Sequence, residues 1–317
     1  MNNNLQPTQW GTFVVAGKHG PIDSATAAAQ HANPKRSVKF THVPTDPVVS
    51  EYRGKHPDRR VLTVDGKCIY PDETLYAHAR IARKAGYPEL VKAQLPPFAE
   101  TLLIVGSGLS ALPLLPEIIE RAKTLPVMAL KGAHDWLIDN VVTPTYAVAS
   151  DPQQSRHDCF KRLNDETIYL LASQMHPDTW DYVRGRKVII WHGETVREQR
   201  TLPEWQGVPL VWGGSTTGLR ALTLGYLLGF RNEDLYGFDS CSQDGVYKLD
   251  GTMVRDKDRE IEVFVGEKRF TSLVSMVPQV AQLRDVLAML PGIKVNAFGE
   301  GYFQEHLAEG KRAGWPV

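Results

Sequence analysis

Cysteine is scarce in this chain, and its three copies form no recognisable framework. They stand at positions 68, 159 and 241 of 317 residues, and none belongs to a CxxC pair. We therefore expect neither a disulfide scaffold nor a zinc knuckle, and a reducing, cytoplasmic setting is the simplest interpretation.

Long apolar runs are also missing. No stretch reaches the roughly 18 consecutive apolar residues of a membrane-spanning helix, so no membrane contact is expected. The N-terminal residues Met1–Gln6 lack the charged segment and apolar core of a signal peptide.

Neither sign of charge is in excess. Lys and Arg together number 36, as do Asp and Glu, so nothing predicts a general nucleic-acid binder. The hydrophobic content of 42% and charged content of 23% are ordinary for a globular enzyme.

What the chain does have is a repeated β-then-α pattern from residue 101 onward. Eight short, continuously apolar runs predict strands covered on both faces. These runs are Leu102–Val105, Val127–Leu130, Tyr146–Ala149, Thr167–Leu171, Lys187–Trp191, Leu210–Trp212, Asp234–Gly237 and Ile293–Ala297. Four segments between them predict helices: Leu112–Lys123, Asp178–Arg184, Thr217–Leu228 and Ser275–Met289.

This alternation predicts an α/β fold with a doubly wound, mostly parallel, Rossmann-like sheet. In such a sheet the strand C-termini share one edge, and ligands bind there.

Two parts of the chain depart from that pattern. Residues 1–97 are predicted to form a small α+β extension, with a turn at Asp65-Gly66 and a helix over Thr74–Lys84, and residues 98–317 the nucleotide-binding domain. Within that domain, a charged insertion at about 240–272 contains one arm of a hairpin, Ile261–Val265. Because it follows a strand end, it is placed to cover a bound ligand, and a solvated surface hairpin is the alternative.

The first candidate site is the turn after the strand at 102–105. It contains Gly106, Ser107, Gly108 and Ser110. Glycines allow a ligand close to the backbone, and free N–H groups and hydroxyls can bind phosphate or ribose. The turn is neither a full dinucleotide fingerprint nor a Walker A loop, because no third glycine and no GK[ST] follow.

A second turn follows the strand at 210–212. Gly213 is followed by Gly214, Ser215, Thr216, Thr217 and Gly218, at the start of a helix of small apolar residues that we expect to be buried. Its amides, hydroxyls and helix dipole predict a phosphate or pyrophosphate site. Two such turns on one edge indicate a nucleotide held from two sides.

Carboxylates and histidines after predicted strands are candidates for acid–base work. Asp151 and Asp239 can act as base, hold a ribose hydroxyl or bind a divalent metal. His134 and His192 also follow strands, where a histidine can be a general base. Each pair has a competing structural interpretation. The aspartates could simply cap the turns that follow the strands, and the histidines could be structural, hydrogen-bonded residues.

The segment Leu103–Ser110 resembles the "GxGPS" opening of the MptE-like/Maf family. Further matches follow in order at Leu130–Ala133, which includes Gly132, at Pro144–Asp151, at Gly213–Gly218 and at Leu235–Asp239. That family includes archaeal 6-hydroxymethyl-dihydropterin pyrophosphokinases and bacterial motility accessory factors that glycosylate flagellin. The resemblance covers about residues 100–300.

The layout is similar, more distantly, to bacterial sialyltransferases that use a CMP-activated sugar. That similarity implies that Tyr247 binds the leaving phosphate. Two departures stand out: Leu109 replaces the proline of "GxGPS", and Phe270-Thr271-Ser272 stands where the sialyltransferases carry a general-base histidine. Another residue, His192 or Asp151, would have to serve as base.

These features predict a nucleotide-dependent transferase, and glycosyl transfer from a CMP- or UDP-sugar to a hydroxyl acceptor is favoured. The alternative is pyrophosphate transfer from ATP to a hydroxymethyl-pterin-type heterocycle, with Mg²⁺ held by Asp151 and Asp239. A non-catalytic nucleotide-binding module is the third hypothesis. A protein, a modified base and a small metabolite are all open as acceptors.

Overall fold

The structure, a computed structural model, describes residues 12–16, 38–40, 60–64, 72–90, 97–153, 159–194, 199, 202–214, 216–254, 260–273, 275–315 and 317. Side chains of residues 12–16, 38–40, 60–64, 72, 98 and 278 are outside that description. Among the helices it describes, none has the length and apolar character needed to cross a bilayer.

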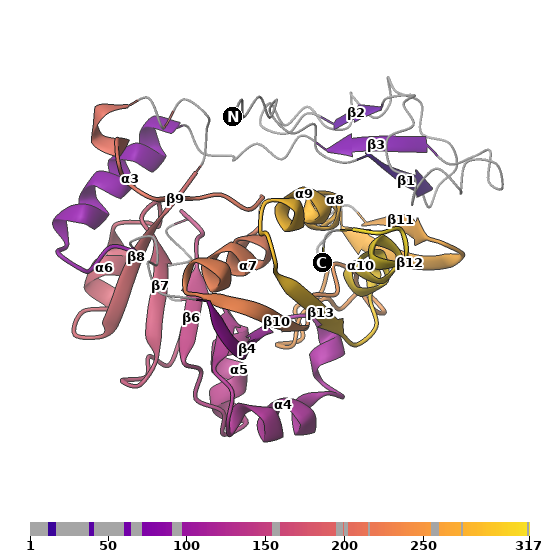
Figure 1. The fold of residues 1–317 in the computed structure, drawn as a ribbon, viewed down its shortest axis with the longest axis horizontal. Coiled ribbons are helices and arrows are strands. Elements are labelled where there is room, and N and C mark those ends of the chain that lie inside the picture. Colours follow the sequence, from indigo (N-terminus) through magenta and orange to yellow (C-terminus); the bar gives the residue numbers. More distant parts are fainter. Residues whose placement is uncertain are drawn as a thin grey trace.

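An eight-stranded parallel sheet organises the molecule (Figure 1). Its strand order is β13-β10-β4-β5-β6-β7-β8-β9, and every pairing is parallel. The strands are β4 Phe98–Val105, β5 Val127–Leu130, β6 Tyr146–Ala149, β7 Ile168–Ala172, β8 Lys187–Gly193, β9 Leu210–Val211, β10 Phe230–Tyr236 and β13 Lys294–Phe298. All eight predicted strands are present, so the predicted Rossmann-like class is confirmed.

Both faces of this sheet are covered. Along β4, Leu102 and Ile104 pack in the larger hydrophobic cluster with Leu219 and Leu222 of helix α7 (Thr217–Leu227). Leu103 and Val105 point to the opposite face. They pack there with residues of α4 (Leu115–Ala122) and α5 (Ala133–Asp139). This alternation is why the strand sequences are apolar at successive positions.

Four further helices contribute side chains to the larger hydrophobic cluster. They are α6 Asp178–Tyr182, α8 Val277–Ala281, α9 Leu283–Ala288 and α10 Tyr302–Arg312. Ahead of α4, a short 3₁₀ turn covers Leu109–Ala111. Helix α7 is buried on several sides, as its small apolar sequence predicts.

The order in which the chain adds strands to the sheet reverses between β4 and β10. From β4 the chain adds β5 through β9 on one side, and then returns to place β10 and β13 on the other side. In open α/β sheets the crevice at such a reversal, outside the strand C-termini, is where ligands bind. The fold therefore places a ligand-binding crevice beside the ends of β4 and β10.

A second sheet joins the two parts of the chain that depart from the repeating pattern. Its order is β12-β11-β1-β3-β2, and all pairings are antiparallel. The strands are β1 Thr12–Ala16, β2 Val38–Phe40, β3 Arg60–Val64, β11 Glu260–Val265 and β12 Lys268–Leu273. The predicted hairpin arm is thus real, and the pairing of Val15 with Val263 ties it to the N-terminal strands. The predicted turn at Asp65-Gly66 lies outside the described residues.

Helix α3 (Asp72–Lys84) lies beside the other end of the parallel sheet (Figure 1). Arg80 forms an ion pair of 2.5 Å with Glu204, and the Tyr76 ring packs on Trp205 at 6.4 Å between centroids. These contacts tie α3 to the segment before β9. The predicted domain boundary near residue 97 stays a prediction.

Candidate functional site

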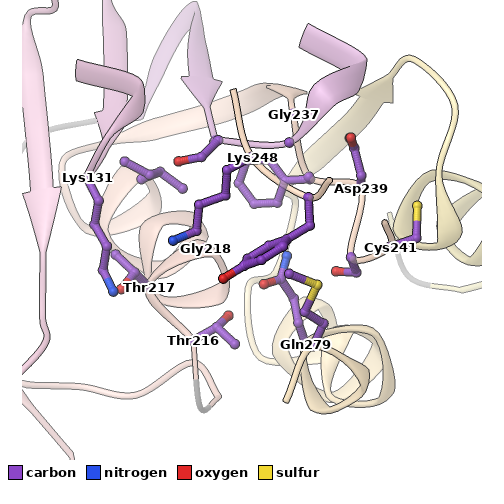
Figure 2. Close-up of a pocket in the computed structure, with 17 residues that line it drawn as sticks. Lys131, Thr216, Thr217, Gly218, Gly237, Asp239, Cys241, Lys248 and Gln279 are labelled. Atoms are coloured by element: carbon purple, nitrogen blue, oxygen red, sulfur yellow. The ribbon is translucent and has the colours of Figure 1, made fainter. Parts of the chain in front are cut away.

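A cavity of about 270 Å³ opens beside the ends of β4 and β10, where the strand order reverses. Its walls come from the ends of β4, β5 and β10, the start of α7, the loop after β10 and the segment that enters α8 (Figure 2). Its lining residues are Gly106, Ser107, Gly108, Leu130, Lys131, Thr216, Thr217, Gly218, Gly237, Phe238, Asp239, Ser240, Cys241, Tyr247, Lys248, Met276 and Gln279. Both glycine-rich turns therefore face the same space.

The first turn uses its glycines to approach β10. The amide of Gly106 donates to the carbonyl of Tyr236 at 2.7 Å, and that of Gly108 donates to the carbonyl of Gly237 at 2.9 Å. A Cβ on Gly106 would stand 2.5 Å from the Gly237 carbonyl oxygen, so no larger residue fits. These two amides were expected to be open to an anion, and the structure instead commits them to the backbone of β10 and its following turn.

Asp239, which also lines the cavity, holds that turn in place through hydrogen bonds. Its carboxylate is only 3% exposed and accepts hydrogen bonds from the Ser110 amide at 2.8 Å, from the Ser110 hydroxyl and from Gln304 Nε2 at 3.1 Å. Burial raises its pKa, and these donors oppose that rise. A Cβ on Gly108 would stand 2.6 Å from the Asp239 Cγ. Ser110 is thus a buried partner of Asp239 and does not line the cavity.

The second turn presents the start of α7 to the cavity. Thr216 caps the helix, because its hydroxyl accepts from the Leu219 amide at 3.2 Å. The Thr217 hydroxyl lies 2.7 Å from that of Ser150, at the end of β6. The first amides of a helix have no acceptor within it, so those of Thr217 and Gly218 are placed to bind an anion. Gly214 packs against Gln282 and Leu219 instead of lining the cavity, and Ser215 is outside the described residues.

Two lysines that the sequence analysis did not select add positive charge. Lys131 follows β5 directly, and Lys248 lies in the loop after β10; Figure 2 shows both side chains extending toward the start of α7. The Lys248 ammonium lies 5.2 Å from the ring centroid of Tyr247, which also lines the cavity. The signal in the sequence for Lys131 was a basic residue directly after a predicted strand. We did not use this signal, because a net charge of zero gave no reason to expect a local basic site.

Asp151 lies beside the cavity rather than in its wall. Its Oδ2 is 3.7 Å from Lys131 Nζ, and its Oδ1 accepts from the Gln153 amide at 3.1 Å. Gly132, next to Lys131, is the N-cap residue before α5, and a Cβ there would be 3.9 Å from the Ser107 hydroxyl oxygen. Both residues thus border the lining without being part of it.

His192 is placed away from the cavity. Strand β8 continues to Gly193, so His192 lies inside the strand, paired with Leu210 of β9. Its Nδ1 is 2.9 Å from the Ser173 hydroxyl and its Nε2 is 3.3 Å from Glu89 Oε2, and burial lowers its pKa. His134 is likewise buried, with contacts to Asp135 and Tyr169. The structure therefore does not bring either histidine to the candidate site.

The carboxylates do not form a ready-made metal centre. Among the residues that the structure describes, no group of three or more His, Cys, Asp or Glu side chains could hold a metal ion. Asp239 would have to exchange its hydrogen bonds to Ser110 and Gln304 to bind one. Cys241 faces the cavity, but burial raises the pKa of its thiol to about 11, so it is a neutral wall group.

The sequence model of the family described as "6-hydroxymethylpterin diphosphokinase MptE-like" matches residues 73–245, more than half of the chain. The chain belongs to the MptE-like family. No curated protein matches it. The resemblance read from the two turns and the strand ends is thus confirmed.

Solved structures show where this MptE-like fold occurs. A Maf glycosyltransferase from Magnetospirillum magneticum AMB-1 superposes with a TM-score of 0.57 at 16% identity. That alignment covers 73% of this chain but only 36% of the larger enzyme. A mammalian sialyltransferase, solved with a Gal-β-1-3GalNAc compound, also matches, with a TM-score of 0.35, 14% identity and coverage of 71% of this chain and 86% of the other. At these identities the similarity to the Maf enzyme shows a common fold.

The MptE-like match divides the cavity into two parts. Both glycine-rich turns, Lys131 and Asp239 lie within residues 73–245. The residues Tyr247, Lys248, Met276 and Gln279 lie beyond it. One wall therefore belongs to the shared family core and the facing wall to the rest of this chain.

Proposed function

We propose that this chain is a nucleotide-dependent transferase that moves a sugar from a nucleotide-activated donor to a hydroxyl acceptor. One observation carries the proposal: the start of α7, two threonine hydroxyls and two lysines meet in a single cavity at the reversal of the strand order. The family supports a transferase acting on a nucleotide, and the groups that line the cavity suit the departing phosphate of a glycosyl transfer.

The cavity is suited to a departing phosphate. In glycosyl transfer the acceptor oxygen bonds to the anomeric carbon, and the bond from that carbon to the phosphate oxygen breaks. The electron pair leaves with the nucleotide phosphate, where negative charge builds up. The helix dipole of α7, the amides of Thr217 and Gly218, and the ammonium groups of Lys131 and Lys248 would stabilise that charge.

The acceptor hydroxyl must also lose a proton, which requires a base. Asp151 is our candidate, because it lies 3.7 Å from Lys131 at the border of the cavity. His192 is buried against Ser173 and Glu89, apart from the cavity. Asp239 is assigned a positioning role, because its three hydrogen bonds hold the first turn against β10.

The donor we propose is a CMP- or UDP-sugar. The acceptor is a protein, a modified base or a small metabolite, and the wall outside the family match, with Met276 and Gln279, is where it would be selected. We propose a cytoplasmic setting for this reaction.

Pyrophosphate transfer from ATP to a hydroxymethyl-pterin-type heterocycle is the second candidate function, and the name of the matching family favours it. It would need Mg²⁺, with Asp151 as one ligand and Asp239 as another after exchange of its present bonds. A nucleotide-binding module without turnover is the third.

A binding panel separates these candidates. The purified chain is titrated with CMP, UDP, GDP, AMP and ATP, with and without Mg²⁺, and binding is measured by calorimetry and thermal shift. Binding of CMP or UDP without metal supports glycosyl transfer, and binding of ATP only with Mg²⁺ supports the kinase. No binding by any nucleotide would contradict both.

Thr216 provides a site-directed test. In Thr216→Val the hydroxyl is lost, and nucleotide binding is expected to weaken by about 1–3 kcal/mol, the usual cost of an unmet polar partner. Because this hydroxyl also caps α7, Thr216→Ser is the matched control: it keeps the cap and should bind normally. Unchanged affinity in Thr216→Val would remove Thr216 from the phosphate site.

A further inference from the structure

Lys131 has a backbone conformation that its residue type seldom adopts. Its φ is +48°, in the left-handed region, and it is one of four such non-glycine residues in the described part of the chain. Its amide donates to the Val148 carbonyl at 3.1 Å, and its carbonyl accepts from the His134 amide at 3.0 Å. Neighbouring β6 and α5 thus hold the strained turn in place, and such strain gathers at functional sites.

The Lys131 side chain is near both the Asp151 carboxylate and the cavity lining at Thr217. Its Nζ is 3.7 Å from Asp151 Oδ2, longer than a direct hydrogen bond, and its side chain is 37% exposed. It also lines the cavity with Thr217, whose hydroxyl lies 2.7 Å from that of Ser150, the residue before Asp151. The Lys131 side chain is therefore near both Asp151 and the start of α7, toward which it extends in Figure 2.

We propose that Lys131 is shared between Asp151 and the donor phosphate. With the cavity empty, the ammonium pairs with Asp151. When a phosphorylated donor binds at the start of α7, the ammonium transfers to the phosphate and the Asp151 carboxylate is released toward the acceptor. This inference rests on the proposed function and adds a regulation of its site.

The exchange has a consequence for the reaction cycle. Asp151 competes with phosphate for one cation, so it lowers the affinity for donor and product alike. After transfer, recapture of Lys131 by Asp151 favours departure of the nucleotide. Lys248 is the comparison residue: it contributes charge to the same cavity, but its ammonium lies over the Tyr247 ring.

A double-mutant cycle tests the sharing, with inorganic pyrophosphate as the probe in calorimetry at one fixed ionic strength. Lys131→Asn removes the charge while keeping a residue type that tolerates positive φ, and should weaken binding about tenfold. Asp151→Asn should tighten binding about three- to tenfold in the otherwise unchanged chain. In the Lys131→Asn background the same change should alter affinity by less than about twofold.

Lys248→Gln is the matched control. It should weaken pyrophosphate binding, yet leave the tightening by Asp151→Asn at full size, because Lys248 is not the shared cation. Lys131→Gly, whose backbone fits positive φ without strain, repeats the test should Lys131→Asn melt at a lower temperature than the parent chain.

Equal tightening by Asp151→Asn with and without Lys131 would overturn the proposal, because the carboxylate would then act through its own charge alone. Unchanged affinity in Lys131→Asn would overturn it as well, and so would the absence of any pyrophosphate binding. In each case the proposed function is judged separately, by whether the unmodified chain binds CMP or UDP in the nucleotide panel.

Discussion

Glu233 is a carboxyl group that the fold buries completely. It lies on β10 beneath Gly225 of α7, where a Cβ would collide with its carboxylate, and neither oxygen has a hydrogen-bond partner among the described residues. Burial raises its pKa well above the ordinary value of 4.5, so the folded chain keeps a proton that the unfolded chain gives up.

That difference makes stability depend on pH. The contribution of neutral Glu233 is fully present below pH 4.5 and is lost as the pH rises toward its raised folded pKa. Glu233→Gln removes the ionisation, so at pH 8 the variant should be more stable than the parent by about 1–3 kcal/mol, with little difference at pH 4. Urea unfolding at both values measures this. Parallel stability curves for the two chains would show that Glu233 does not carry the dependence.

The candidate site was only partly predictable at this scale. The glycines and threonines of both turns could be selected because their residue types suit tight turns and helix starts. The hydrogen bonds of their amides could not be predicted, because the Gly106 amide donates to Tyr236, which lies on a strand 130 positions away in the sequence. His192 was misplaced because the strand that carries it continues for two residues past its apolar run.

At the scale of the elements, helix α5 is followed by a residue with an unfavourable backbone conformation. Val141 follows it with a φ of +64°, a conformation that suits glycine, and its side chain is 94% exposed. A β-branched residue gains nothing there to offset the strain.

Val141→Gly should therefore raise the free energy of unfolding by about 1 kcal/mol, because the left-handed position no longer carries a Cβ. Thermal denaturation of the purified variant checks this. Val142, which is buried at 5% exposure, is the control, and Val142→Gly should destabilise the chain. A lower melting temperature for Val141→Gly would contradict the expectation.

The strands of the parallel sheet and helix α7 were predictable from their apolar residues, whereas α5 and α10 were not. The eight parallel strands are covered on both faces, so their apolar runs mark them closely, and α7 is identified by its small apolar residues. Helix α5 has only seven residues and half-polar composition, and α10 carries Gly310 and many charges. Neither was predicted, because charged residues interrupt the apolar positions of both helices; α5 packs against β5, and α10 packs against β11.

At the scale of the whole molecule, β1 connects chain segments about 250 residues apart. It is the central strand of the antiparallel sheet, between β11 and β3. The β11–β12 hairpin that it holds lies between two lining segments of the cavity, Lys248 before it and Met276 after it.

Val15→Pro should loosen this connection, because proline cannot donate to a central strand and disturbs its neighbours. Amide hydrogen exchange in β11 should become faster, and nucleotide affinity should fall while the parallel sheet keeps its protection. Val15→Ala is the control, since it keeps the backbone donor. Unchanged exchange in β11 would mean that the hairpin stands without its N-terminal partner.

The cavity draws its walls from positions as far apart as Gly106 and Gln279. During synthesis, the ribosome must therefore pass Gln279 before a ligand can contact the full set of lining residues. A ligand that binds only the folded state can stabilise only those chains in which all the lining segments have been synthesised and have folded. Chains that end before Gln279 lack part of the lining, so a bound ligand would protect longer chains from proteases and leave these shorter ones exposed.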